Sequence, residues 1–164
     1  AASNTIILSI GDMACVMTSK EQLVYTSNKG KTWEAIETPI LIEEAYQGIY
    51  SIDLYDEMNG FGIGGDFSKP ELNVYNKMRT SDGGKTWSLI ADGEYPGYKS
   101  CVQYIPNSGA QDLVATGFTG ISYSKDGGAT WEALSEEGFY TIRFLNDSIA
   151  YAAGKNKIAQ LTFR

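Results

Sequence analysis

The sequence predicts an all-β protein built from repeated four-stranded antiparallel sheets. An eight-residue pattern occurs three times, and each of the three Trp residues ends one copy. Trp33, Trp87 and Trp131 are 54 and 44 positions apart, a period typical of repeat folds. The 164 residues also include 18 Gly and only 4 Pro, which suits many short strands joined by glycine turns.

The octapeptide reads hydroxyl residue, any, Asp or Asn, any, Gly, any, Thr, Trp. The Asp or Asn can accept hydrogen bonds from backbone N–H groups further along, and the Gly can supply a positive φ. The Trp then offers a large apolar surface for burial. We therefore expect a tight, structural turn between two strands at each copy. The pattern residues are Thr26, Asn28, Gly30, Thr32 and Trp33; Thr80, Asp82, Gly84, Thr86 and Trp87; and Ser124, Asp126, Gly128, Thr130 and Trp131.

The octapeptide resembles the Asp-box, or BNR repeat, of sialidases and many other β-propellers. Its flanks are similar to propeller strands, as at residues 74–79 before the second copy and 88–90 after it. Over essentially the whole chain the sequence resembles the photosystem II stability/assembly factor-like group of BNR-repeat proteins. The resemblance implies a β-propeller fold. Bacterial members of this group often carry the labels oxidoreductase or glycosyl hydrolase, so it specifies fold better than activity.

We expect a single domain over residues 1–164. Its blades are predicted at about residues 1–38, 48–91, 99–135 and 139–164. In the first blade, Ile6-Ile7-Leu8 indicates a buried strand, because inner propeller strands are covered on both sides. We expect the four strands of this blade at residues 5–10, 13–18, 22–26 and 33–37.

The second blade begins with an alternating run at residues 49–55, followed by the Asn59-Gly60 hairpin signal. Its strands are expected at 49–55, 61–65, 74–80 and 86–91, with residues 66–73 as an exposed insertion. For the third blade the expected strands are 100–105, 112–117, 120–124 and 130–135. For the fourth they are 140–145, 148–153 and 157–163.

Three full blades and one three-stranded blade are thus expected. We interpret them as the C-terminal half of a longer propeller, of seven blades as the resemblance implies. Open blade faces would expose apolar sheet, so a missing N-terminal half or a second copy of the chain should cover them.

Composition excludes several classes of function. The net charge is −7 and the pI about 4.6, whereas nucleic acids need a basic face. With no His, the chain has no Ser-His-Asp triad and no His-ligated zinc. No apolar run is long enough for a membrane span, and no signal peptide opens this sequence. The group it resembles leads us to expect a bacterial protein that is periplasmic or secreted.

No metal or cofactor is expected. Cys15 and Cys101 each lie in an apolar run without a CxxC neighbour, so buried free thiols are favoured over a disulfide. The carboxylates at Asp82 and Asp126 are too few for a calcium site. The glycines of residues 60–65 are followed by no helical pattern, so they indicate a strand and not a dinucleotide-binding loop.

Propellers usually bind ligands on the face opposite the Asp-boxes, and the loops expected there carry acidic and aromatic residues. Such residues could bind a glycan by hydrogen bonds and ring stacking, or a protein through an aromatic hot spot. A solvated acidic loop surface is the plainer interpretation. The candidate ligand-face residues are Glu43, Glu44, Tyr46, Asp66, Lys69, Glu71, Glu94, Tyr95, Tyr98 and Lys99.

Sialidase-like catalysis is not expected. Such enzymes grip a carboxylate with three arginines, and this chain has only Arg79, Arg143 and Arg164. Arg79 enters an octapeptide and Arg164 is the last residue, so the three should not converge. The leading hypothesis is a non-catalytic binding or assembly module for a protein or glycan. The alternative is a carbohydrate-active enzyme, sialidase-like or another glycoside hydrolase, with part of its site on a missing N-terminal half. Glycan binding without turnover would favour the first hypothesis.

Overall fold

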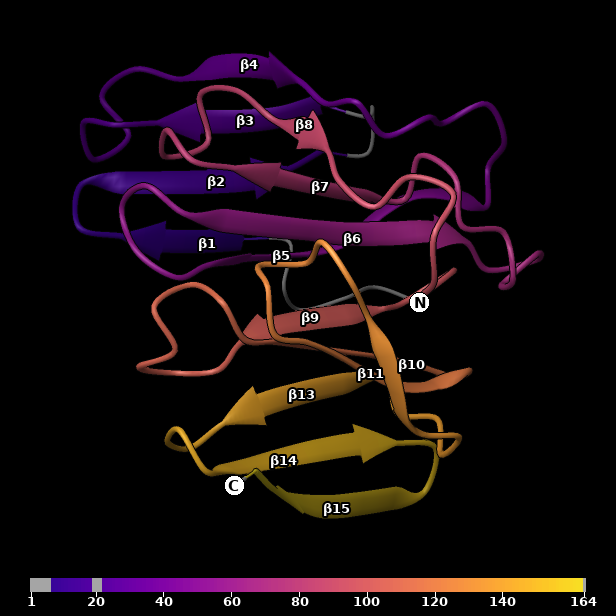
Figure 1. Ribbon diagram of the computed structural model, residues 1–164. Coiled ribbons are helices and arrows are strands. Elements are labelled where there is room, and N and C mark those ends of the chain that lie inside the picture. The colour runs from indigo at the N-terminus through magenta and orange to yellow at the C-terminus, as the bar shows by residue number, and fades with distance from the viewer. Residues whose placement is uncertain (1–6, 19–21, 164) are drawn as a thin grey trace.

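The computed structural model describes residues 7–18 and 22–163. Over these residues every regular element is a β-strand, and the strands form four antiparallel sheets (Figure 1). Three sheets have four strands and the last has three, with the strands of each sheet in sequence order. The all-β propeller segment of three full blades and one three-stranded blade is therefore confirmed.

The strand bounds of each sheet are as follows. The first sheet contains β1 (Ile7–Ile10), β2 (Met13–Met17), β3 (Gln22–Thr26) and β4 (Glu34–Glu37). The second contains β5 (Gln47–Leu54), β6 (Gly60–Asp66), β7 (Lys77–Thr80) and β8 (Ser88–Leu89). The third contains β9 (Cys101–Tyr104), β10 (Leu113–Gly117), β11 (Gly120–Ser124) and β12 (Glu132–Ser135). The fourth contains β13 (Thr141–Phe144), β14 (Ile149–Gly154) and β15 (Lys157–Thr162).

The strand expected at residues 74–80 is shorter than predicted. Tyr75 has a φ of 51°, and its N–H donates to the Asp92 carboxylate at 2.6 Å. This left-handed conformation interrupts the predicted strand near its start, so β7 begins only at Lys77. Residues 5 and 6 of the first predicted strand lie outside the described ranges. The prediction that this strand is buried is wrong for Ile7, which is 63% exposed because no described sheet covers the side of β1 on which it lies.

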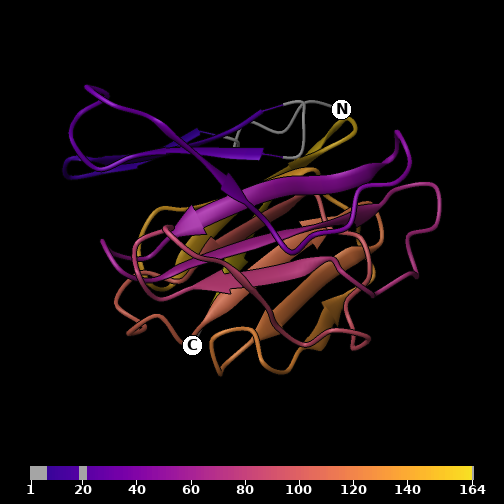
Figure 2. The same ribbon diagram turned by 90° about the horizontal axis from the view of Figure 1, so that it is seen from above.

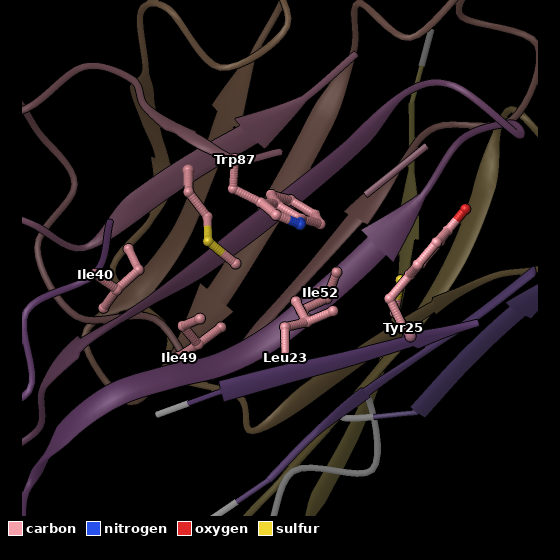
Figure 3. Packing of buried hydrophobic residues seen from close by; sticks show 8 residues of the cluster. Leu23, Tyr25, Ile40, Ile49, Ile52 and Trp87 are labelled. Carbon is pink, nitrogen blue, oxygen red and sulfur yellow. The ribbon is translucent and has the colours of Figure 1, made fainter. Parts of the chain in front are cut away.

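Three apolar cores lie between successive sheets. In the first core, Leu23 and Tyr25 of the first sheet face Ile52 and Trp87 of the second (Figure 3). The other two cores lie between the second and third sheets, around Phe61, and between the third and fourth, around Ile142. Each sheet is therefore stabilised chiefly by its neighbours, as expected for blades.

Side chains on the first strands of the second and third sheets accept hydrogen bonds from the backbone of the first strand of the next sheet. Ser51 accepts a hydrogen bond from the Val102 N–H at 2.9 Å, and Gln103 accepts one from the Phe144 N–H at 3.0 Å. Propeller blades place their first strands side by side in this way, around the common axis.

The outward face of the first sheet is open. Cross-strand pairing places Ile7, Val16, Val24 and Ala35 in one row across its four strands. In the second sheet the corresponding row is Ile52, Gly62, Met78 and Leu89, and its apolar side chains pack against the first sheet. Seen from above, the first sheet lies at the edge of the molecule (Figure 2). In the described residues nothing occupies the corresponding place beside the first row.

The connections gather at two opposite ends of the sheets. The three octapeptides join the third strand to the fourth in each of the first three sheets, on the left of Figure 1; this is called the turn end. The second-to-third strand connections of the second, third and fourth sheets and the sheet-to-sheet connections lie on the right, at the loop end. The loop end is the face on which ligand binding was predicted.

Both cysteines are buried and free, as predicted. Burial raises the pKa of Cys15 to about 11, so its thiol stays protonated and packs as an apolar group. Neither thiol is accessible for chemistry at the surface.

Candidate functional site

The second octapeptide turn is closed by its own side chains. The Thr80 hydroxyl donates to Asp82 at 2.8 Å and accepts from the Gly84 N–H at 2.9 Å. Asp82 in turn accepts from the Thr86 N–H at 3.0 Å and from the Thr86 hydroxyl at 2.6 Å. Burial is the largest single influence on the pKa of Asp82 and raises it, but the hydrogen bonds together hold this pKa below its usual value. The carboxylate is therefore fully engaged in holding the turn.

The same hydrogen bonds recur in the third turn, where Ser124 takes the place of Thr80 and Asp126 takes the place of Asp82. In the first turn Asn28 takes the place of the carboxylate. Its Oδ1 accepts from the Thr32 N–H at 2.9 Å, and its Nδ2 donates to the Thr32 hydroxyl at 2.7 Å. Lys29 adopts a φ of 60° and Gly30 a φ of 78°, so the degenerate copy forms the same kind of turn.

The three Trp side chains differ in burial. Trp87 is 8% exposed and packs in the first core, while Trp131 lies against Phe61 of the second sheet with ring centroids 5.7 Å apart. Trp33 is 47% exposed, so the prediction of burial at every copy is wrong for this residue. Trp87 and Trp131 each pack on the preceding sheet, whereas the described residues provide no preceding sheet for Trp33.

A row of aromatic side chains crosses the loop end. Tyr46 lies 5.0 Å from Phe67, Phe67 lies 6.4 Å from Tyr98, and Tyr98 lies 5.2 Å from Phe118, as ring-centroid distances. Tyr50 contacts both Phe67 and Tyr98. We call these five residues the aromatic row. Edge-to-face pairs of this kind stabilise one another beyond simple burial.

Several connections of the second and third sheets bring the row together. Tyr46 and Tyr50 flank the start of β5, and Phe67 follows β6. Tyr98 precedes β9, and Phe118 lies in the hairpin between β10 and β11. Tyr98 is only 5% exposed and forms the base, whereas Tyr46, Phe67 and Phe118 are 52%, 39% and 46% exposed. The row thus presents rings to solvent on a rigid support.

The phenols of Tyr50 and Tyr98 are held neutral because their pKa values are raised. Burial raises the pKa of Tyr98 to about 12, with a further contribution from Tyr50. Burial, together with the nearby Asp66 carboxylate, also raises the pKa of Tyr50, whose hydroxyl donates to the Tyr46 carbonyl at 2.9 Å. The rings therefore offer apolar faces and hydroxyl dipoles, without charge, at physiological pH.

A cavity of about 410 Å³ adjoins the row between the first and second sheets. The Gln47 side chain shapes its wall by accepting hydrogen bonds from the N–H groups of Glu43, at 3.0 Å, and Glu44, at 3.4 Å. Its lining includes Met17, Gln22, Ile42, Glu43, Glu44 and Tyr50. A cavity lined by both apolar and polar side chains, two of them acidic, can accept a side chain of a bound segment.

Two lysines are buried beneath the loop end. Lys77 donates to the carbonyl oxygens of Glu94, at 2.7 Å, and Pro96, at 2.8 Å. Lys99 donates to the Gly120 carbonyl at 3.0 Å and to the Thr119 hydroxyl at 3.2 Å. Burial lowers the pKa of each lysine to about 8. Both hold loop backbone in place, and Lys99 braces the hairpin that carries Phe118.

The structure separates the candidate ligand-face residues into two groups. Asp66, Tyr98 and Lys99 have buried side chains, and Asp66 accepts from the Ser68 N–H at 2.8 Å and from the Ser68 hydroxyl. They shape the surface from below. The exposed candidates are Glu43, Glu44, Tyr46, Lys69, Glu71, Glu94 and Tyr95.

Of these candidates, Tyr46 and Tyr98 belong to the aromatic row. Sequence reasoning missed its other members, Tyr50, Phe67 and Phe118. Phe67 and Phe118 each follow a glycine-containing strand end, and that signal could have marked them. Tyr95 lies apart from the row, hydrogen-bonded to Ser122 at 2.7 Å.

Across residues 7–18 and 22–163, no group of three or more His, Cys, Asp or Glu side chains could hold a metal ion. The same part of the chain contains no helix long and apolar enough to cross a membrane.

Four blade-like sheets and their repeated turns define a β-propeller protein of the BNR class. The chain belongs to the family described as photosynthesis system II assembly factor YCF48, whose sequence pattern matches residues 6–156. No curated protein matches the chain.

Solved structures with a similar fold include both assembly-factor and enzyme propellers. A structure of YCF48 bound to D1 peptide has a TM-score of 0.58 and 18% identity, over 98% of this chain and 56% of that one. An ancestral GH74 enzyme has a TM-score of 0.66 and 11% identity, over 98% of this chain and 23% of that one. The GH74 enzyme of Niastella koreensis has a TM-score of 0.65 and 16% identity, over 92% of this chain and 27% of that one.

This chain therefore spans about a quarter to about half the length of these proteins. At such low identity the likeness shows the propeller fold alone.

Proposed function

We propose that the chain is a non-catalytic binding module that recognises a segment of another protein at its loop end. The observation that carries this proposal is the aromatic row. Its three exposed rings stand on a buried Tyr98 base, and such anchored aromatic side chains are the usual centres of binding energy in protein interfaces. The adjoining cavity of about 410 Å³ supplies a place for one side chain of the bound segment.

Family membership supports an assembly role. The family is named for a photosystem II assembly factor, and one structural neighbour, YCF48, is bound to a D1 peptide. By extension, an extended peptide segment of a partner under assembly is the ligand that we assign to this chain. We expect the working protein in a bacterium, outside the cytoplasm.

Binding to a peptide can be tested with the D1 peptide as probe, using calorimetric titration. We expect Tyr46→Ala and Phe118→Ala each to weaken binding about tenfold or more. Tyr151→Ala is a matched control, because Tyr151 is 46% exposed, like Phe118, but lies on β14 and outside the row. Equal effects of the control and the row variants would contradict the proposed site.

Carbohydrate-active chemistry is the second candidate. It is supported by the GH74 neighbours and by the exposed rings, which could stack on sugars. Glycoside hydrolysis normally requires two carboxyl groups on either side of the bond to be cleaved. Xyloglucan is a suitable test substrate, because a further GH74 neighbour is a xyloglucanase from Xanthomonas campestris. Release of reducing sugar from it, abolished by Glu43→Gln or Glu44→Gln, would favour this alternative; glycan binding without turnover would favour the module.

We also propose that further blades cover the open faces of the first and last sheets, as parts of a longer, seven-bladed propeller. A second copy of the chain is the alternative occupant. The open row on the first sheet supports this, because the equivalent row of the second sheet is packed against a neighbour. A stable lone monomer in sedimentation experiments would argue against a second copy.

A further inference from the structure

We infer that the segment bound by the aromatic row is cationic, with Lys or Arg side chains placed among apolar ones. This inference rests on the proposed function and specifies the chemistry of the partner. It follows from the charges around the row, from the sequestration of the nearby lysines, and from the electronic character of the exposed rings.

Acidic residues lie at both ends of the row. Glu43 and Glu44 are exposed and lie three and two residues before Tyr46 in the chain. At the far end, Glu136 and Glu137 are exposed and precede Gly138, where an added Cβ would collide with the backbone of Phe118. A segment that crosses the row from Tyr46 to Phe118 therefore meets carboxylates at each end.

Most of the neighbouring positive charge is not available to a ligand. Lys77 and Lys99 are 0% and 1% exposed and donate to backbone carbonyls. Lys157 pairs with Glu137 at 3.4 Å and lies over the Phe139 ring at 4.3 Å. Lys69, in the loop after Phe67, is the exposed cation within the row's own connections. The exposed surface is thus predominantly acidic, in keeping with the net charge of −7.

The rings add a second attraction for cations. Aromatic faces attract ammonium and guanidinium groups through the ring quadrupole, and this protein already places Lys125 over Tyr123 at 5.4 Å. The exposed carboxylates at both ends of the row set the sign of the local potential. A polyanion such as a nucleic acid would be repelled by the same surface.

The test uses three synthetic peptides of one length that share their apolar residues and differ only in bearing Lys and Arg, Gln, or Glu at the remaining positions. Fluorescence polarisation measures their binding at low and at physiological salt. We expect the cationic peptide to bind about tenfold more tightly than the acidic one, with a preference that shrinks as salt rises.

Variants then locate the charges responsible. A triple variant with Glu43→Gln, Glu44→Gln and Glu136→Gln should lose most of the preference for the cationic peptide. The matched control is Glu34→Gln, Glu37→Gln and Glu132→Gln, which changes the net charge equally on exposed residues of the outer strands β4 and β12. Equal loss in both triple variants would overturn the inference.

The outcomes separate this inference from the proposed function. If peptides bind and Phe118→Ala weakens them, but peptide charge makes no difference or the acidic peptide binds best, the inference is wrong and the binding module stands. If no peptide of any charge binds in a way that depends on Phe118, both are wrong.

Discussion

Trp131 of the third sheet lies against Phe61 of the second, with ring centroids 5.7 Å apart and ring planes inclined at 57°. The turn that precedes Trp131 also lies against the Phe61 ring, since a Cβ at Gly128 would collide with that ring. Gly128 also has a φ of 90°, which favours glycine independently. The octapeptide thus acts between sheets as well as within one, because it presses its Trp onto the preceding blade.

The Trp residues should differ in their contribution to stability. We expect Trp87→Ala to lower the free energy of unfolding by about 3–5 kcal/mol, as for other large core truncations. Trp33→Ala should cost about 1 kcal/mol or less, because that indole is already half exposed. Urea unfolding followed by circular dichroism measures both. Similar losses for the two variants would show that the described contacts do not account for the role of the octapeptide Trp.

The turn hydrogen bonds should tolerate an amide in place of the carboxylate. Asn28 already makes the equivalent bonds in the first turn, so Asp82→Asn should cost less than about 1 kcal/mol and Asp82→Ala about 1–3 kcal/mol. Thermal unfolding of both variants provides the comparison. An Asn variant as unstable as the Ala variant would show that charge, and not hydrogen-bond geometry, holds the turn.

Asp53 should make stability depend on pH in the mildly acidic range. It accepts a hydrogen bond from the Tyr104 N–H at 2.7 Å, and burial raises its pKa to about 6. Because the pKa of Asp53 is higher in the folded than in the unfolded state, the protonated carboxyl group favours folding. Its contribution to the free energy of unfolding is complete below about pH 4 and is lost as the pH rises through 6. Asp53→Asn keeps an acceptor and removes the titration.

We therefore expect the melting temperature of Asp53→Asn to vary less between pH 4 and 6 than that of the parent chain. Asp147→Asn is a suitable control, because Asp147 is an exposed carboxylate at the β13–β14 turn. Parallel profiles for Asp53→Asn and the parent would contradict the assignment.

Lys99 should act in the alkaline range with the opposite sign. Burial lowers its folded pKa to about 8, so the folded state releases a proton that the unfolded state retains up to about pH 10. Stability contributed by this residue therefore rises as pH increases from 8 to 10. Lys99→Met should flatten that rise and loosen the hairpin of Phe118. Hydrogen exchange of the Thr119 and Gly120 amides would detect the loosening, and unchanged exchange would count against the brace.

The strands that lead into the octapeptides were largely predictable from sequence, because the hydrogen-bonded turn fixes where each of them ends. The strands that follow begin later than predicted, and β8 covers only Ser88–Leu89 of the predicted residues 86–91. β3 and β11 have the predicted bounds. The end of β7 also agrees, but its start does not, because a hydrogen bond to Asp92 seventeen residues away imposes the left-handed turn at Tyr75. A contact between residues so far apart cannot be predicted from the local sequence around Tyr75.

The binding surface was less predictable for a similar reason. Acidic and aromatic residues in the right connections indicated a ligand face, yet the contacts among Tyr46, Phe67 and Phe118 depend on how neighbouring sheets pack. Lys99 was expected at the surface because lysines usually lie there. Its burial depends on the Gly120 carbonyl and the Thr119 hydroxyl, which only the folded hairpin supplies.

The half-exposed indole of Trp33 can serve as an intrinsic fluorescence probe. With Trp87 and Trp131 replaced by Phe, the remaining emission would come from one ring on the uncovered side of the first sheet. Any blade that closes over that side would move the emission to shorter wavelengths, whereas a ligand confined to the loop end would leave it unchanged. One spectrum could therefore distinguish completion of the propeller from occupation of its binding surface.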